Sequence, residues 1–182
     1  GKQGHAIAAA LASRGASVTL VSGPVNEAPP GHVNLIPVTT AAEMLNACTN
    51  AIANQPTDIA ICAAAVSDWR VKSVASKKLK KPHDSSANML LELSQNPDIL
   101  ANLSTSKNRP KLVIGFAAET ENLFENATAK RHRKGCDWMI ANQVGGDDDP
   151  VFGSTTNEAL MITKRNVETW PKMLKTELAE KI

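Results

Sequence analysis

The stretch that decides the fold is Ile59-Ala60-Ile61-Cys62-Ala63-Ala64-Ala65-Val66, an apolar run that ends at Ser67-Asp68-Trp69-Arg70. A short apolar run between polar residues predicts a buried strand, here over residues 58–66. A dense cationic segment follows, Lys77-Lys78-Leu79-Lys80-Lys81. Ligands of open α/β sheets bind beyond the carboxyl ends of such strands. The sequence therefore predicts a polyanion site at this end of the strand, although a solvated basic loop would also explain the lysines taken alone.

Helical and strand patterns alternate along the rest of the chain. Helices are expected at residues 2–14, 40–53, 96–104 and 119–135, and from Pro171 onward. Strands are expected at residues 18–21, 33–38, 111–116 and 137–141, with 89–93 as a further strand or exposed arm and 157–163 with 166–170 as a late hairpin. This alternation predicts an α/β fold, a Rossmann-like parallel sheet with helices on both faces.

Two helix starts carry specific signals. Thr40 with Glu43 forms a capping box, and Asn96 is an expected N-cap before Pro97 at the first helical position. The chain itself opens at Gly1-Lys2-Gln3-Gly4, on the threshold of a helix, whereas a doubly wound fold normally begins with a strand and a glycine-rich turn. We therefore expect residues 1–182 to be a single domain from which the first strand and the glycine-rich loop are missing.

Composition narrows the function classes. The net charge of +2 provides no global field for nucleic acid or an anionic membrane, so neither is an expected partner. No apolar stretch reaches the roughly 20 residues of a membrane span. The three cysteines, Cys48, Cys62 and Cys136, are odd in number and widely spaced, which fits a reducing cytosol. The expected location is cytoplasmic.

An alternative function class comes from the start of the chain. The first residues match half of a dinucleotide-binding fingerprint, since Gly1-Lys2-Gln3-Gly4 precedes an expected helix and a strand follows at Val18-Thr19-Leu20-Val21. A nicotinamide-dependent oxidoreductase is therefore the second hypothesis. The chain has no Tyr, which argues against the short-chain dehydrogenases, because those enzymes protonate their substrate with a Tyr. A nucleic-acid-binding module is a third class, and the near-neutral charge and 3% aromatic content argue against it.

Candidate site residues occur near the ends of the expected strands and helices. Asp68 follows the strand at 58–66 and would hold Mg²⁺ or a ribose hydroxyl, or simply form a turn. Lys78 would neutralise phosphates. Phe116 would offer its ring to a base or lie in the core. The four histidines make no ligand set and are expected at the surface.

Two lysines of the expected helix at 119–135 lie four residues apart. Lys130 and Lys134 would share one helix face about 5–6 Å apart, so that an anion between them would relieve their repulsion. An ordinary solvated basic helix end is the alternative. The segment Asn96-Pro97-Asp98-Ile99 would direct free helix N–H groups at phosphate or base, or serve only as a cap.

The order of these motifs resembles one family. The set of motifs is similar to that of the bacterial phosphopantothenate–cysteine ligase domain. Its members, in chain order, are the strand end 62–64 with Asp68, the lysines around Lys78, Asn96-Pro97-Asp98-Ile99, Gly115-Phe116-Ala117-Ala118-Glu119-Thr120, and Lys130 to Lys134. The resemblance covers essentially all 182 residues. In that family the domain is usually the carboxyl-terminal half of a bifunctional coenzyme A biosynthesis protein, and the other half is a flavin-dependent decarboxylase. FMN is therefore implied only if such a half precedes Gly1.

The resemblance implies a reaction and a set of site residues. The substrates would be CTP, 4′-phosphopantothenate and cysteine, with Mg²⁺ on the phosphates and an acyl-cytidylate intermediate. Lys78 matches the lysine on the triphosphate and is the expected catalytic residue. The matching nucleotide contacts are Cys62, Ala63, Ala64, Asp68, Lys78, Asn96, Pro97, Asp98, Ile99, Phe116, Lys130 and Lys134.

The match is not complete. The family's Asn that handles the acyl intermediate has no counterpart, because the chain starts too late. Ser67 stands where relatives often carry Ala, and Trp69 where Tyr is common. The sequence does not decide between CTP and ATP. A homodimer is expected, by resemblance and because 89–93 would pair as an arm.

Overall fold

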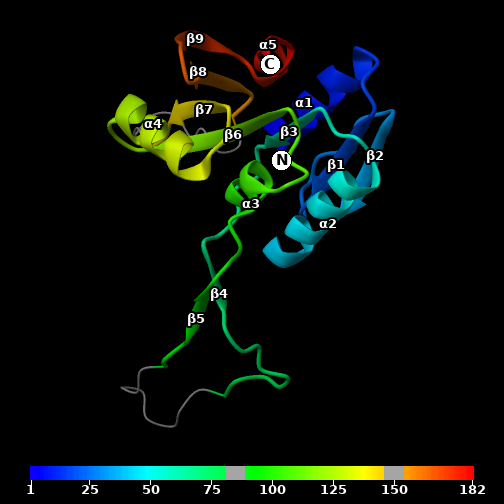
Figure 1. Cartoon of the computed structure of the whole chain (residues 1–182). Coiled ribbons are helices and arrows are strands. Elements are labelled where there is room, and N and C mark those ends of the chain that lie inside the picture. The colour runs from blue at the N-terminus through cyan, green and yellow to red at the C-terminus, as the bar shows by residue number, and fades with distance from the viewer. Residues whose placement is uncertain (81–88, 146–153) are drawn as a thin grey trace.

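The computed structural model describes residues 1–80, 89–145 and 154–182. Figure 1 shows a body of sheet and helices from which one long arm projects. Its helices are α1 (Lys2–Ser13), α2 (Ala41–Asn54), α3 (Ile99–Thr105), α4 (Leu123–Lys134) and α5 (Lys175–Lys181). Its strands are β1 (Val18–Ser22), β2 (Val33–Pro37), β3 (Ile59–Cys62), β4 (Trp69–Val71), β5 (Leu93–Gln95), β6 (Leu112–Glu119), β7 (Trp138–Gln143), β8 (Thr156–Ile162) and β9 (Val167–Leu174).

The main sheet has five strands in the order β3-β6-β7-β8-β9. The strands β3, β6 and β7 run parallel, and the hairpin of β8 and β9 adds two antiparallel strands. Separately, β1 and β2 form a parallel pair. The predicted α/β fold is confirmed, but the sheet is mixed rather than wholly parallel, because a hairpin connection can join only antiparallel neighbours.

Helices cover both faces of the main sheet, as predicted. On one face, Ala127 of α4 and Leu100 of α3 pack against Val113, Ala117 and Met139. On the other face, Leu178 of α5 packs against Ile114, Ile140 and Trp170, and Ile7 and Ala10 of α1 pack beside them. The residues at the centre of β6 and β7 are almost completely buried, with Val113, Met139 and Ala141 at 0% exposure. This rigid centre holds the strand ends in place.

One position in β6 must be a glycine because of close packing. A Cβ atom on Gly115 would lie 2.5 Å from Leu100 Cδ2 and 3.2 Å from Met139 Cε. The absence of a side chain therefore lets α3 approach β6 closely, beside the start of the arm.

Several boundaries differ from the predictions. The strand predicted at 58–66 ends at Cys62, because β6 pairs only with residues 59–62 and the following alanines leave the sheet. The strand β6 continues to Glu119, so α4 begins at Leu123 rather than at 119. Pro171 lies inside β9 and does not start the last helix. A proline is tolerated there because β9 is an edge strand, which needs fewer N–H donors.

The arm is an antiparallel hairpin of β4 and β5, with Trp69 opposite Gln95 and Val71 opposite Leu93. The predicted strand at 89–93 is wrong in its bounds, since the strand covers Leu93–Gln95. The prediction of an exposed arm is confirmed. The strand β4 was not predicted, because three residues are too short for a periodic pattern to be visible.

Candidate active site

The predicted site begins where β3 ends. Cys62 is its last residue, Ala63 is partly buried, and Ala64 is exposed. Ala63 also packs beside Ile7 and Ala10 of α1. Because Ala63 and Ala64 carry no polar side-chain atoms, their backbone N–H and C=O groups are the only hydrogen-bonding groups that they can offer to a ligand.

Burial makes the Cys62 thiol unreactive. Burial is the main reason that its pKa is raised to about 12, and Cys48, Cys136 and Asp98 raise it further. The thiolate is the nucleophilic form of cysteine, so at neutral pH Cys62 remains an inert packing residue. Cys48 and Cys136 also have raised pKa values through burial. Covalent catalysis through these thiols is therefore not supported.

The base of the arm connects Asp68 to Asn96. The Asn96 backbone N–H donates to Asp68 O at 2.8 Å, and Asn96 Nδ2 donates to Ser67 O at 2.8 Å. Arg70 Nη1 donates to Gln95 O at 2.6 Å on the same side of the arm. The Asp68 side chain is exposed and has no hydrogen-bond partner within residues 1–80, 89–145 and 154–182. Its carboxylate is thus available to a ligand.

The start of α3 follows directly, but with a different cap from the predicted one. Asp98 is the N-cap, and its Oδ1 accepts from the Ala101 N–H at 3.0 Å. Asn96 was expected to be the N-cap with Pro97 in the first turn. Instead, Asn96 is committed to the arm base, and Pro97 precedes the cap. Ile99 is the first helical residue and is buried.

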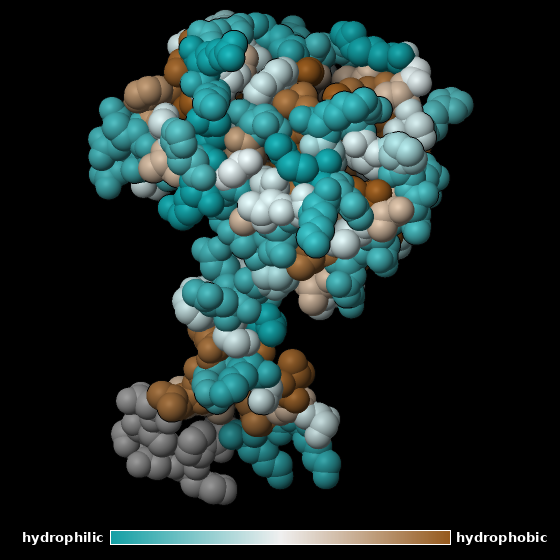
Figure 2. Space-filling view, viewed as in Figure 1, coloured by the Kyte–Doolittle hydropathy of each residue, from teal (hydrophilic) through white to brown (hydrophobic). Residues whose placement is uncertain are grey.

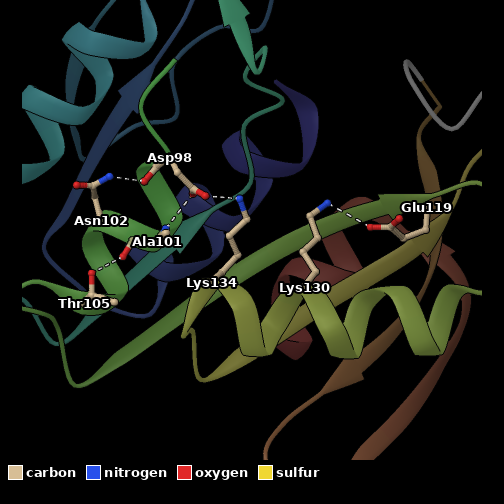
Figure 3. Close-up of polar contacts among 7 residues, drawn as sticks. All are labelled: Asp98, Ala101, Asn102, Thr105, Glu119, Lys130 and Lys134. Carbon is tan, nitrogen blue, oxygen red and sulfur yellow. Dashed lines mark hydrogen bonds and ion pairs between the residues drawn. The ribbon is translucent and has the colours of Figure 1, made fainter. Parts of the chain in front are cut away.

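Lys130 and Lys134 each have a carboxylate partner. Lys130 Nζ lies 3.2 Å from Glu119 Oε1, and Lys134 Nζ pairs with Asp98 Oδ2 (Figure 3). Both ammonium groups come from α4 and point toward the ends of β6 and α3 (Figure 3). The two carboxylates relieve the repulsion between the lysines in this structure, and binding of an anion by Lys130 and Lys134 stays a prediction.

The pair of Asp98 and Lys134 changes the acidity of the carboxyl group. Partial burial alone would raise the pKa of Asp98, but hydrogen bonds from Lys134 Nζ and the Ala101 N–H lower it, so that the net shift is downward. Asp98 therefore remains ionised near neutral pH. An incoming polyanion would have to share Lys134 with this carboxylate.

Phe116 has a partly structural role. It lies in β6, is partly buried, and packs against the clusters around Ile114 and Ile7. Its location agrees with the alternative that Phe116 is a core residue. Its incomplete burial leaves part of the ring accessible.

Lys78 does not lie with the other predicted site residues in this structure. It is exposed in the segment after β4, and Figure 1 shows this segment continuing along the arm, away from the sheet. The neighbouring Lys81 lies outside the described residues, as does His83. The tertiary structure therefore groups the strand end, the arm base, α3 and the α4 lysines, and separates Lys78 from them.

Metal-binding groups are sparse near the site. In the part of the chain that the structure describes, no three His, Cys, Asp or Glu side chains cluster as a metal site would require. His5 was expected at the surface but is buried, and its Nδ1–H donates to Gly1 O at 3.1 Å. Within the same described residues, no helix is long and apolar enough to cross a membrane.

Sequence reasoning missed two residues of this region. Glu119 was noted only as part of a strand-end motif, although it pairs with Lys130. Arg70 holds the arm base through Gln95 O. Glu119 and Lys130 were expected in one helix about three turns apart, too far to pair, and only the placement of Glu119 in β6 with α4 packed along that strand reveals the pair.

These features define the class of protein. It is a Rossmann-like α/β domain with a projecting hairpin and with polar groups gathered at the carboxyl ends of β3 and β6. The family described as DNA/pantothenate metabolism flavoprotein C-terminal domain matches residues 1–182. The chain belongs to this family.

Two individual proteins are similar in sequence to this chain over most of its length. The chain is 46% identical over 161 residues to the Escherichia coli (strain K12) coenzyme A biosynthesis bifunctional protein CoaBC, a match that covers 88% of the chain and 38% of that relative. It is 41% identical over 180 residues to the protein of the same name from Haemophilus influenzae, covering 98% of the chain and 43% of the relative. The chain thus spans less than half the length of these relatives.

A solved structure supports the fold. The crystal structure of the C-terminal domain of coenzyme A biosynthesis bifunctional protein CoaBC matches with a TM-score of 0.78 and 36% identity, over 100% of this chain and 78% of that one. The order of secondary structure is therefore that of a known family domain.

Proposed function

We propose that this domain joins 4′-phosphopantothenate to cysteine in coenzyme A biosynthesis, using CTP. The observation that carries the proposal is the family match over residues 1–182, together with relatives named for coenzyme A biosynthesis. The geometry supports it, because the site offers backbone groups, a free carboxylate and ammonium groups rather than a nucleophile. Such groups position substrates and neutralise phosphate charge.

The proposed reaction has two steps. A carboxylate oxygen of 4′-phosphopantothenate attacks the α-phosphorus of CTP, and the bond from that phosphorus to the bridging oxygen breaks to release pyrophosphate. The cysteine amine then attacks the acyl carbon of the resulting acyl-cytidylate. CMP leaves with the electron pair of the broken acyl–oxygen bond, and the nitrogen loses a proton to give the amide.

The chain's own residues would bind and orient the nucleotide. The backbone at Cys62, Ala63 and Ala64 would hold the base or ribose, with the exposed part of Phe116 nearby. The segment Asn96 to Ile99 would place α3 against the nucleotide, and Lys130 and Lys134 would share their charge with the phosphates. These two lysines are only 29% and 19% exposed in their side chains, so the charges that they offer are partly desolvated and correspondingly strong.

Asp68 is the residue that fits Mg²⁺. Its carboxylate is exposed and unpartnered among the described residues, at the carboxyl end of β3. Mg²⁺ is commonly held by one or two carboxylates together with substrate phosphates and water, so a single Asp suffices. When bound, the ion would neutralise phosphate charge. FMN would belong to a different half of a longer protein.

Lys78 would reach a triphosphate only through the arm. Either the arm folds toward the sheet or it extends over the site of a second copy. Eight of the fourteen large apolar residues that are exposed in the described chain lie on the arm, among them Val74 at 89% and Leu90 at 97% (Figure 2). A soluble monomer rarely exposes so many apolar side chains together. We therefore propose a homodimer in which the arm packs on the partner.

Light scattering tests the homodimer. We expect a dimer for the wild type and a shift toward monomer for Leu90→Asp, with unchanged circular dichroism. A wild type that is monomeric at micromolar concentration would remove the proposal. Leu35→Asp, at a 38% exposed position in β2, is the matched control and should remain dimeric.

The strands β1 and β2 suggest how the domain is completed. Among the described strands β1 pairs only with β2, and β3 pairs only with β6, while α1 contacts β1 and also packs beside Ile61 of β3. We propose that residues 1–182 form one domain in which a further strand, from a segment preceding Gly1, lies between β1 and β3. The family's acyl-handling Asn would then belong to that segment.

Pyrophosphate release tests the reaction. We expect release that requires both CTP and 4′-phosphopantothenate in a protein that includes the preceding segment. Thermal unfolding with CTP or NADPH separates the ligase from the nicotinamide-dependent oxidoreductase, because a ligand at about 100 times its Kd adds about 2.7 kcal/mol of stability. Stabilisation by NADPH but not by CTP would overturn the proposal, and ATP in place of CTP tests base selection.

A further inference from the structure

A basin of about 450 Å³ lies at the amino end of β7, whereas the candidate active site lies at the carboxyl ends of β3 and β6. Its walls are the end of α4, the start of β7 and the turn between β8 and β9. This is the amino end of β7, because α4 returns from the carboxyl end of β6. The volume is within the range of small-molecule sites. The residues that carry charge there are Arg131, His132, Asp137, Lys164 and Arg165.

Arg131 is buried, and none of the carboxylates in residues 1–80, 89–145 and 154–182 pairs with it. It is only 7% exposed, and its Nη1 donates to Cys136 O at 3.4 Å. Its Nη2 lies 3.3 Å from His132 Nε2, and its buried Nε has no hydrogen-bond partner in the described residues. A buried guanidinium without an anion is unfavourable, because the charge loses water without gaining an opposite charge. Within the described residues, the Arg131 guanidinium therefore lacks a negative group to pair with.

The rest of the basin adds positive charge. Lys164 and Arg165 are exposed in the turn, and neither forms an ion pair within the described part of the chain. Asp137 is the single carboxylate of the lining, but its Oδ2 already accepts from Arg109 Nη2 at 2.5 Å and from the Val113 N–H at 2.8 Å. The end of α4 contributes about half a negative charge, which three full positive charges outweigh.

We propose that this basin binds the phosphate group of a small anionic metabolite. The guanidinium of Arg131 lies in the wall of the basin and is fixed there by its burial, and guanidinium groups match phosphate geometry. Lys164 and Arg165 would close over the anion from the turn. This site is distinct from the nucleotide site at the carboxyl ends of β3 and β6, and it does not depend on the proposed ligase reaction.

The test is a titration of the full protein with inorganic phosphate, followed by NMR. To keep the nucleotide site occupied, the titration is made with saturating CTP and at constant ionic strength. We expect shifts of the Gly135, Cys136, Lys164 and Arg165 amides and of the Trp138 indole. The double variant Lys164→Gln/Arg165→Gln should weaken phosphate binding about tenfold, equivalent to about 1.4 kcal/mol.

Two further variants complete the design. Lys107→Gln removes an exposed lysine from the turn before β6, outside the basin, and should leave phosphate binding unchanged. Arg131→Lys keeps the charge but loses the planar fork, and should weaken binding while retaining the fold by circular dichroism. The proposal is overturned if these amides do not shift, if chloride shifts them equally, or if the double variant binds phosphate as tightly as Lys107→Gln.

Discussion

The centre of the main sheet and the arm are opposite kinds of structure in one chain. Val113, Met139 and Ala141 are 0% exposed, whereas the arm residues Val74 and Leu90 are 89% and 97% exposed. The centre is stable by itself because its side chains are enclosed on both faces. The arm has backbone pairing at its base, and its apolar side chains, such as Val74 and Leu90, are exposed among the described residues. The fold therefore encloses the strands that form the site and leaves the lysine-bearing segment of the arm exposed.

The strongest test of this contrast compares two methionines. Met139→Ala should lower the free energy of unfolding by about 2–5 kcal/mol, because it opens a cavity in the buried cluster between β7 and α4. Met89→Ala, at a 54% exposed arm position, should change it by less than about 0.5 kcal/mol in the monomer. Urea denaturation at low protein concentration measures both, and similar losses for the two variants would break the comparison.

The second test concerns activity rather than stability. If Lys78 acts on the triphosphate as proposed, Lys78→Gln should slow pyrophosphate release by about 100-fold, because it removes a charge that would stabilise the transferring phosphates. Its free energy of unfolding should stay unchanged, since an exposed lysine contributes little. The control is Lys72→Gln in the same arm, whose ammonium instead lies 2.5 Å from Glu92 Oε1. Equal rates for wild type and Lys78→Gln would contradict the assigned role.

The third test concerns the close packing of α3 against β6 at Gly115. Gly115→Ala should lower the free energy of unfolding by about 1–3 kcal/mol, because the new methyl would lie 2.5 Å from Leu100 Cδ2. The double variant Gly115→Ala/Leu100→Ala should be less destabilised than the sum of its two single variants, because the clash is relieved. Strict additivity in urea denaturation would show that the close approach of α3 is not the cause.

The smallest effect concerns pH. The pKa of Asp98 is lowered below its ordinary value of 3.8 in the folded protein, by Lys134 and the Ala101 N–H acting against partial burial. A lowered folded pKa gives stability that is present above the unfolded pKa and is lost as pH falls through the folded value. Asp98→Asn should therefore flatten the loss of stability below about pH 4 while keeping a capping side chain. An unchanged pH profile would contradict the assignment.

The sequence signals that proved reliable are local. The capping box of Thr40 and Glu43 is present, with Glu43 N–H donating to Thr40 Oγ1 at 3.1 Å. The backbone N–H groups of Thr39 and Thr40 donate to Glu43 and lower its pKa. Gly135 ends α4 in the left-handed conformation with φ of 70°. Each signal depends on residues within one or two helical turns, so the neighbouring sequence contains all that is needed.

Boundary errors arose where a distant segment competes for the same groups. Asn96 has the residue type and position of a helix cap, but the Ser67 carbonyl takes its side chain. The apolar run after Cys62 resembles a strand, yet the chain leaves β6 after Cys62, although β6 itself continues to Glu119. Pro171 resembles a helix start, but an edge strand accepts it. In each case the tertiary partner decides between two locally acceptable conformations.

The chain's own sequence determines the α/β class and most helices and strands, because periodicity, caps and charge are properties of neighbouring residues, whereas the site residues stay a prediction from the sequence. Only the tertiary structure decides that Lys130 and Lys134 pair with Glu119 and Asp98, and that Lys78 lies out along the arm. It also buries Arg131 without an acidic partner among residues 1–80, 89–145 and 154–182. Electrostatic energy depends on distance and burial, and both arise only when segments far apart in the chain meet.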